Sequence, residues 1–213
     1  MTPRVVEIVD EAFAIGLQQI REEILELATY LAARPLRHVL EIGAAAGGSF
    51  YIWCRLADPR GKKVSVDLPG GIYGGEPQAN RMTRYRRDRM MRGWAPGVHL
   101  VAGISASDEV RSQVAAVLGA DRLDLLFIDG DHTYEAVKAD FELYSRFVSP
   151  SGAIAFHDIN DTAFHRAQNV GVARLWSALE GDKREFNARR EWGGIGVLTG
   201  VRAGEAAADR VVR

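Results

Sequence analysis

The side chains best suited to chemistry stand in two short segments of the second half of the chain. Asp129, Asp131 and His132 belong to FIDGDHTYE, and His157 and Asp158 end the apolar run AIAFHDI. Each segment closes a stretch that is predicted to be a buried strand. If the two strands are neighbours, they lie about 4.8 Å apart, so Asp129 and Asp158 converge. Two carboxylates this close repel each other unless a cation or a proton lies between them.

These segments predict a divalent metal site formed by Asp129, His157 and Asp158. Carboxylate oxygens are the ligands that Mg²⁺ prefers, while the imidazole of His157 leaves Mn²⁺, Fe²⁺ and Zn²⁺ open. The alternative is that His157 points away and only ends its strand. His132 is a candidate general base because an imidazole titrates near neutrality. Its alternative role is to hydrogen-bond to backbone at the start of a helix.

A second group of residues is suited to a nucleotide-like ligand. The small residues of EIGAAAGGS, at 41–49, allow backbone to approach a ligand closely, and the helix that follows offers free N–H groups. Asp67 ends the next predicted strand, where a carboxylate suits the two hydroxyls of a ribose. The structural alternative is a tight turn between strand and helix, followed by a solvated aspartate.

The elements that must position these residues alternate along the chain. Strands are predicted at 38–42, 63–67, 98–102, 123–129, 152–157, 184–188 and 194–199. Helices are predicted between them at 48–57, 78–92, 108–118, 133–147 and 171–179. This alternation indicates an α/β fold whose mostly parallel sheet carries helices on both faces. Ligands of such sheets bind beyond the carboxyl ends of the strands, where the candidate residues lie.

Two further helices are predicted ahead of the sheet, at 5–15 and 17–33. The second carries an apolar face, which favours packing on the main sheet or on a partner subunit over a place on a membrane surface. The chain is thus divided into an N-terminal helical extension at 1–35, a sheet domain at 36–200 and a tail at 201–213.

Composition excludes several classes of protein. The 213 residues include 47% hydrophobic and 26% charged side chains, enough for one sizeable core and unlike a disordered chain. A net charge of −1 argues against a general nucleic-acid binder, and no apolar run is long enough to span a membrane. The single cysteine, Cys54, rules out an intrachain disulfide. With no export signal recognised near Met1, these features predict a cytoplasmic protein.

Four segments together resemble one protein family: VLEIGAAAGGSF, VSVDLPGG, FIDGDHTYEAVKADFELY and GAIAFHDI. They are similar to class I S-adenosylmethionine-dependent methyltransferases, from about Arg37 to Thr199. Within that class they resemble the small family that includes metal-dependent sugar O-methyltransferases of macrolide antibiotic pathways and cephalosporin-hydroxylase-like proteins. The resemblance implies a Rossmann-like class I methyltransferase fold, with a mostly parallel seven-stranded sheet, a C-terminal β-hairpin and N-terminal helices.

The resemblance also implies how S-adenosylmethionine would be held. Glu41 and Gly43 would face its methionine end, Asp67 its ribose hydroxyls and Ser105 the neighbourhood of its adenine. The cofactor-binding set that it implies comprises Glu41, Gly43, Gly47, Ser49, Asp67, Ser105 and Asp129.

For the reaction, the resemblance implies that Asp129, His157 and Asp158 hold the metal, with Mg²⁺ first and Mn²⁺ or Fe²⁺ as alternatives. His132 would be the general base, assisted by Asp129. One departure bears on the metal: the position of His157 is commonly acidic in the metal-binding members. The implied activity is O-methylation of a small-molecule hydroxyl on a natural product or sugar, by a homo-oligomer without nucleic-acid or membrane partners.

An insertion at 70–92 follows the second predicted strand. Its glycines and Tyr73 are typical of an active-site lid. The arginine-rich stretch at 81–92 favours a solvated face or a subunit interface over a site for an anionic substrate or RNA.

Three other functions compete with methyl transfer. The glycine turn and the pair Tyr134 and Lys138 match parts of a short-chain dehydrogenase. However, helices precede the glycine strand, and Tyr134 stands at the start of its helix instead of well inside it. The other two are a non-catalytic cofactor-binding scaffold and a methyltransferase-fold enzyme of hydroxylase-like or cyclase-like chemistry.

Overall fold

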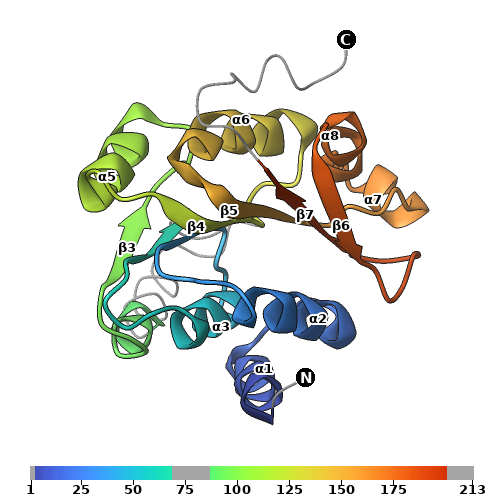
Figure 1. Ribbon diagram of the computed structural model, residues 1–213. Coiled ribbons are helices and arrows are strands. Elements are labelled where there is room, and N and C mark those ends of the chain that lie inside the picture. The colour runs from blue at the N-terminus through green and yellow to red at the C-terminus, as the bar shows by residue number, and fades with distance from the viewer. Residues whose placement is uncertain (1–2, 69–86, 201–213) are drawn as a thin grey trace.

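The sheet that was predicted from the alternating pattern forms the centre of the molecule (Figure 1). The computed structural model describes residues 3–68 and 87–200. Its seven strands are β1 (Val39–Ile42), β2 (Lys63–Asp67), β3 (Val98–Ala102), β4 (Leu123–Ile128), β5 (Val148–His157), β6 (Asp182–Phe186) and β7 (Ile195–Thr199). They follow the order β3-β2-β1-β4-β5-β7-β6. The first five are parallel, and β7 runs antiparallel to both β5 and β6. The predicted fold, including the C-terminal hairpin, is confirmed.

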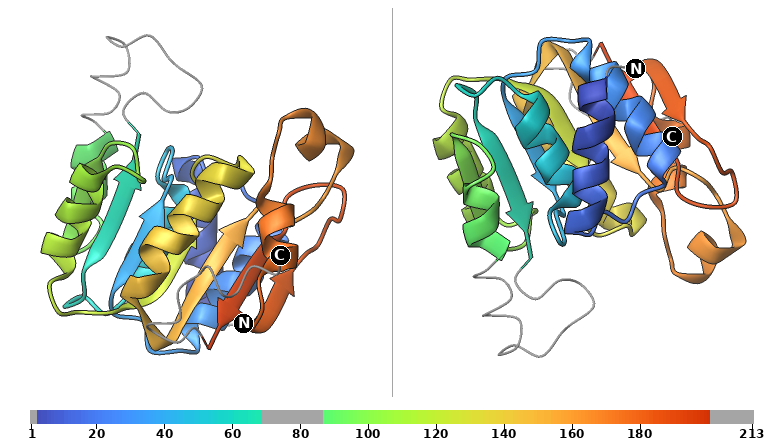
Figure 2. Two further views of the ribbon diagram at one scale, coloured as in Figure 1. Left: turned by 90° about the horizontal axis from the view of Figure 1, so that it is seen from above. Right: turned by 90° about the horizontal axis from the view of Figure 1, so that it is seen from below.

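Helices cover both faces of the sheet (Figure 2). One face carries α1 (Pro3–Ile15), α2 (Arg21–Ala32) and α3 (Gly48–Leu56), and the other carries α5 (Asp108–Leu118), α6 (Tyr134–Tyr144) and α8 (Val172–Ala178). A short helix, α7 (Ala163–Ala167), follows β5, and a 3-10 turn at Ser145–Phe147 ends α6. The chain therefore has the three-layer arrangement that buries a parallel sheet on both sides.

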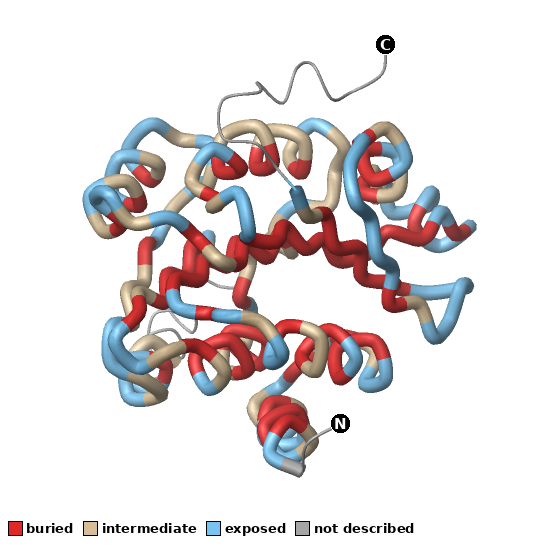
Figure 3. Tube along the Cα trace, in the orientation of Figure 1, coloured by how far each residue is buried: buried red, intermediate tan, exposed pale blue. Residues whose placement is uncertain are grey.

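Alternating side chains of the central strands enter two separate cores. Leu125 and Phe127 join the core beneath α1, α2 and α3, while Leu126 and Ile128 join the core beneath α5, α6 and α8. This is the period of two expected of a strand. Figure 3 shows the middle of the sheet as buried and the β6 edge as largely exposed.

The N-terminal helices differ from the prediction in a way that matters for the site. The continuous helix expected at 17–33 begins only at Arg21, because Gly16 has a φ of +119° and Ile20 is extended. The segment 16–20 instead crosses toward the carboxyl edge of the sheet. Helix α1 packs on α2 and α3 within the same chain.

Some predictions fall outside the described residues. The tail at 201–213 and most of the insertion at 70–92, with the greater part of the predicted helix 78–92, lie there; residues 87–92 are helical. Within the described ranges, no helix has the length and apolar character needed to cross a bilayer.

Candidate active site

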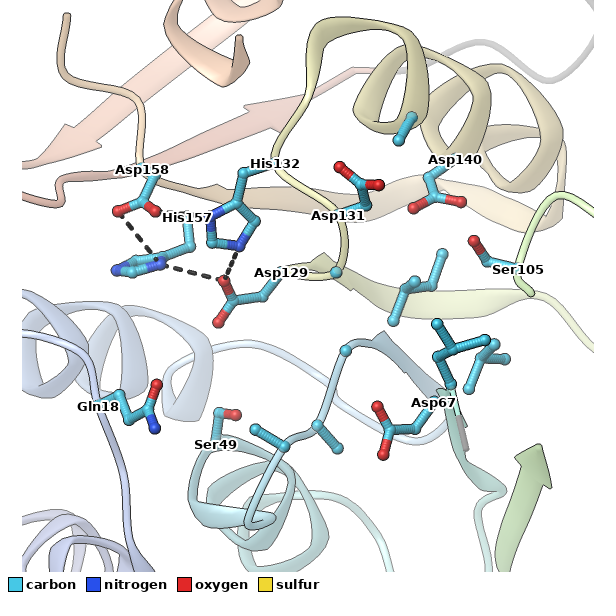
Figure 4. A pocket seen from close by; sticks show the side chains of 18 of the residues that line it. Gln18, Ser49, Asp67, Ser105, Asp129, Asp131, His132, Asp140, His157 and Asp158 are labelled. Carbon is cyan, nitrogen blue, oxygen red and sulfur yellow. Dashed lines mark hydrogen bonds and ion pairs between the residues drawn. The ribbon is translucent and has the colours of Figure 1, made fainter. Parts of the chain in front are cut away.

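A cavity of about 600 Å³ follows the carboxyl edge of the sheet, reaching from the ends of β2 and β3 to the end of β5. This size is within the range of small-molecule sites. Figure 4 shows Asp67 and Ser105 toward one end of it, and His132, His157 and Asp158 toward the other. The predicted site residues that line it are Gly43, Ser49, Asp67, Ser105, Asp129, His132, His157 and Asp158.

The strand register brings Asp129 next to His157. Ile128 of β4 pairs with Phe156 of β5, so these two residues come next on their strands. His157 Nδ1 lies 3.0 Å from Asp129 Oδ1. Asp158 follows with a φ of +64°, a left-handed conformation that is uncommon for residues with a side chain but more frequent for Asp and Asn.

His132 joins the two carboxylates. Its Nε2 lies 3.2 Å from Asp129 Oδ1, and its Nδ1 lies 2.8 Å from Asp158 Oδ2. His157 Nδ1 is also 3.4 Å from Asp158 Oδ1. We call these four residues the acid–imidazole cluster. The predicted convergence of Asp129 and Asp158 is therefore present, with an imidazole ring between them.

The charges of the acid–imidazole cluster compensate one another. Burial lowers the pKa of His132, but hydrogen bonds and charges from Asp129 and Asp158 outweigh burial and raise that pKa to about 11. Burial likewise opposes a charged His157, and the charge of Asp129 raises its pKa. Against the effect of burial, the histidines hold the pKa values of Asp129 and Asp158 below the usual range. The two carboxylates thus favour the imidazolium form of His132.

The metal site predicted at Asp129, His157 and Asp158 is not confirmed. Across residues 3–68 and 87–200, no group of three or more His, Cys, Asp and Glu side chains is arranged to hold a metal ion. The imidazoles of the cluster instead face its carboxylates. The donor chemistry nevertheless fits a hard divalent cation: the His132 imidazolium lies between two carboxylates, where a competing cation would sit. Asp158 Oδ1 is also buried without a hydrogen-bond partner in the described ranges.

The glycines of the first turn are required by the protein's own contacts. Gly43 has a φ of +87°, and a Cβ there would lie 2.2 Å from the carbonyl oxygen of Asp129. Gly47 has a φ of +99°, and a Cβ there would lie 2.7 Å from the ring of Trp94. Glycine at 43 therefore lets the turn after β1 touch the turn after β4, which brings both turns to one edge of the pocket.

Two predicted cofactor residues, Glu41 and Gly47, are not among the residues that line the pocket. Glu41 is fully buried and accepts a hydrogen bond from the Ser49 hydroxyl. Burial raises the pKa of Glu41 well above its usual value. Glu41 therefore positions Ser49, which lines the pocket, from the side of Ser49 that faces the core. This placement differs from the predicted direct contact between Glu41 and a ligand.

Asp67 has a protein partner that the sequence did not reveal. The Arg87 guanidinium forms an ion pair with Asp67 Oδ2 and donates to the carbonyl oxygen of Ala45 at 2.7 Å. Both charged side chains are largely buried, at 17% and 15% exposure. Arg87 thus ties the end of β2 to the turn after β1.

Residues 16–19 line the pocket, although 17–19 were predicted to be helical. Gln19 Nε2 donates to Asp129 Oδ2 at 2.5 Å. The signal that could have located this segment is Gly16, whose left-handed φ ends α1.

An aromatic pair at the mouth of the pocket carried no sequence signal. Phe164 and Trp192 are 49% and 40% exposed, and their ring centroids lie 4.8 Å apart. The fully buried Glu23 accepts hydrogen bonds from the backbone N–H groups of Ala188 and Gly194, at 2.9 and 3.0 Å. Glu23 thereby holds the loop between β6 and β7 that carries Trp192.

Sequence comparison identifies a family. Residues 40–159 match the model of a family described as a methyltransferase domain. The uncharacterized protein y4gI of Sinorhizobium fredii is 27% identical over 179 residues, covering 78% of this chain and 17% of y4gI. The uncharacterized protein R132 of Acanthamoeba polyphaga mimivirus is 51% identical over 61 residues, covering 29% of this chain and 28% of R132. The chain therefore spans less than a third of each of these relatives.

Solved structures share the fold. The O-methyltransferase TomG of Streptomyces achromogenes, in complex with SAM, has a TM-score of 0.60 at 16% identity and covers 94% of this chain and 92% of its own. The MycE methyltransferase from the mycinamycin biosynthetic pathway, in complex with Mg, SAH and mycinamycin VI, has a TM-score of 0.59 at 14% identity. That match covers 96% of this chain and 56% of MycE.

Proposed function

The chain belongs to the methyltransferase-domain family, and we propose that it transfers a methyl group from S-adenosylmethionine to a hydroxyl of a small-molecule acceptor. One observation carries the proposal: a single cavity joins the carboxylate of Asp67 to the acid–imidazole cluster. The carboxylate of Asp67 is suited to binding the ribose of the cofactor. The acid–imidazole cluster is suited to removing the proton of the acceptor hydroxyl.

The Asp67 end suits the nucleoside of the cofactor. A carboxylate at the end of the second strand of such a sheet accepts hydrogen bonds from ribose hydroxyls, and Arg87 orients this one through Oδ2. The turn at Gly43 and Ser49 then leads along the edge toward Asp129. When bound, S-adenosylmethionine supplies a methyl group made electrophilic by its sulfonium.

The other end suits the acceptor. Phe164 and Trp192 offer an exposed apolar surface beside the acid–imidazole cluster. An acceptor that lies against these rings is held with a hydroxyl toward His132, and such positioning supplies much of the rate of a displacement reaction. A hydroxyl on a natural product or sugar has this combination of apolar and polar surface.

His132 is the proposed general base. A ring nitrogen can take the hydroxyl proton only when the ring is neutral, so the ion pairs with Asp129 and Asp158 must weaken in the loaded site. We propose that a divalent cation, Mg²⁺ first, is held by Asp129 and Asp158 with His157 beside it. When bound, it would polarise the acceptor hydroxyl and neutralise the two carboxylates.

Calorimetric titration with S-adenosylhomocysteine tests the cofactor half of the proposal. The wild-type chain and the Asp10→Asn control, changed at an exposed residue of α1, should bind alike, and Asp67→Asn should bind more weakly. If the wild type does not bind the ligand, the proposed function is wrong. If Asp67→Asn binds as tightly as the wild type, the placement of the ribose is wrong.

The aromatic pair of Phe164 and Trp192 provides a test of where the acceptor binds. Once an acceptor is found, Trp192→Ala should raise its KM while leaving the affinity for S-adenosylhomocysteine unchanged, because Trp192 lies at the end of the pocket away from Asp67. Trp192→Phe, which keeps an aromatic ring, should restore most of the loss. An unchanged KM in Trp192→Ala would contradict the proposed acceptor position.

A further inference from the structure

A buried carboxyl group at the Asp67 end of the pocket has no role in the reaction described above. Asp140 belongs to α6, is 2% exposed and lines the cavity. The Ser105 side chain, in the loop after β3, lowers the pKa of this carboxyl, and Figure 4 shows the two side chains on the far side of the pocket from Asp67. Asp140 is therefore a polar group held at the surface where a nucleoside would bind.

One oxygen of Asp140 lacks a partner. Its Oδ1 is buried and accepts no hydrogen bond from any residue in the described ranges. A buried acceptor left unsatisfied costs about 1–3 kcal/mol, and a buried charge without a partner costs more. Burial accordingly raises the pKa of Asp140 to about 6, although Ser105 opposes this. Such a group is expected where a ligand supplies the missing donor.

The loop that carries Ser105 is held firmly. The Tyr144 hydroxyl, one turn along α6 from Asp140, donates to the carbonyl oxygen of Ser105 at 2.6 Å. Because this bond joins α6 to the backbone of Ser105, the loop is held near Asp140 before a ligand enters. The acceptor is thus preorganised, which favours selective binding.

The surroundings of this acceptor are apolar. Leu68 and Ile104 line the same end of the cavity and are 36% and 62% exposed, two of the few large apolar side chains exposed in the described ranges. Leu68 follows Asp67 directly, and Ile104 precedes Ser105. The carboxylate of Asp131 also lines the cavity and raises the pKa of Asp140 further. An apolar surface bordered by carboxylate acceptors suits a flat heteroaromatic ring that carries an amino group.

We propose that Asp140, whose buried Oδ1 lacks a partner in the described ranges, accepts a hydrogen bond from the 6-amino group of the cofactor's adenine and so selects adenine over hypoxanthine. This inference rests on the proposed function, because it takes the nucleoside of the cofactor to lie at the Asp67 end. A 6-oxo group in the same place presents an oxygen to a carboxylate, which is repulsive. Selection between the two bases follows from this difference, because a buried polar site rejects an analogue that lacks the matching donor.

The test compares three ligands by calorimetry on the full chain. They are S-adenosylhomocysteine, its deaminated analogue S-inosylhomocysteine, and its 7-deaza analogue, which keeps the 6-amino group. The wild type should bind S-adenosylhomocysteine at least tenfold more tightly than the inosyl compound, or about 1.4 kcal/mol. The 7-deaza compound should bind within a few-fold of the parent. Equal binding of the adenosyl and inosyl compounds would overturn the inference.

Variants distinguish recognition of the adenine base by Asp140 from a purely structural role of this residue. Asp140→Asn should reduce the adenosyl-to-inosyl ratio to less than threefold, because an amide can donate to a 6-oxo group. Glu142→Gln removes a carboxylate from the same helix, outside the pocket, and should keep the full ratio. If Asp140→Asn keeps the wild-type ratio of affinities for the adenosyl and inosyl compounds, Asp140 does not recognise the base.

The wild-type ratio does not depend on any variant, so it decides the inference even if Asp140→Asn does not fold. The two possible failures give different results. If S-adenosylhomocysteine and the inosyl compound bind equally well, only the adenine selection by Asp140 is wrong. If S-adenosylhomocysteine does not bind at all, both this inference and the proposed function are wrong.

Discussion

The carboxylates at the two ends of the pocket differ in how their charge is compensated. In the acid–imidazole cluster, each carboxylate lies within about 3.5 Å of both imidazoles, although Asp158 Oδ1 makes no hydrogen bond in the described ranges. At the other end, Asp67 pairs with Arg87, while Asp140 keeps a buried oxygen without a partner in the described ranges. The charges of the cluster are thus compensated within the protein, whereas Asp140 is left open for a donor from outside. The difference indicates that a ligand must compete with the protein at the cluster, but only complete the site at Asp140.

The largest effect is expected at the cluster. His132→Ala should lower kcat about 10²- to 10⁴-fold, the usual contribution of a general base, with little change in affinity for S-adenosylhomocysteine. His99→Ala, changed in β3 outside the pocket, serves as the control and should retain activity. Single-turnover methyl transfer and calorimetry measure the two quantities. A loss of affinity with unchanged kcat would place His132 with the cofactor instead.

Metal removal should have the next largest effect. Treatment with EDTA should lower activity, and Mg²⁺ should restore it, because a cation would take over the carboxylates that His132 now occupies. Asp158→Asn, which removes one of those carboxylates, should raise the Mg²⁺ concentration needed for half-maximal activity. Activity unaffected by EDTA in both proteins would exclude the proposed cation and leave the closed ion-pair cluster as the working state.

A smaller effect is expected at the other end. Asp67→Asn should raise the Kd of S-adenosylhomocysteine about tenfold, since a charge-assisted hydrogen bond contributes about 1.5–3 kcal/mol and a neutral acceptor remains. Arg87→Ala should raise the Kd less, because Arg87 only orients the carboxylate. If Arg87→Ala weakens binding more than Asp67→Asn does, Arg87 contacts the ligand directly and the comparison of the two ends must be revised.

The smallest effect concerns stability. The pKa of Asp140, about 6 in the folded chain, lies above its usual value. Stability from this group is therefore complete below pH 3.8 and is lost as the pH rises through 6. Asp140→Asn, which cannot ionise, should raise Tm by a few degrees at pH 7.5 and leave it unchanged at pH 3.5. Glu142→Gln should show no such dependence on pH. A gain that is equal at both pH values would contradict an unpartnered buried carboxylate.

The strand ends were predictable because chemistry and periodicity coincide there. Apolar runs that stop at Asp129 and His157 identify buried strands and their carboxyl ends together. The register then follows from neighbouring strands in a parallel sheet, and it brings these two residues side by side. Asp67 and Ser105, which also follow predicted strands, line the same pocket.

The remaining parts of the site depend on tertiary contacts that have no local pattern. Leu17, Ile20 and Ile24 keep helical spacing although residues 17–20 are not helical, so the pattern did not reveal that Gln19 lines the pocket. Asp140 resembles any polar residue of an amphipathic helix until α6 is seen against the loop of Ser105. The cluster's geometry was likewise unpredictable, because residue types suited to a metal are equally suited to ion pairs.

The most direct test of the proposed function is a crystal structure of the chain with S-adenosylhomocysteine bound. We expect the ribose hydroxyls on Asp67, the 6-amino group of the adenine on Asp140, and the sulfur atom on the side of the pocket facing His132. A ligand bound outside this cavity, or within it with the ribose away from Asp67, would contradict the proposed function.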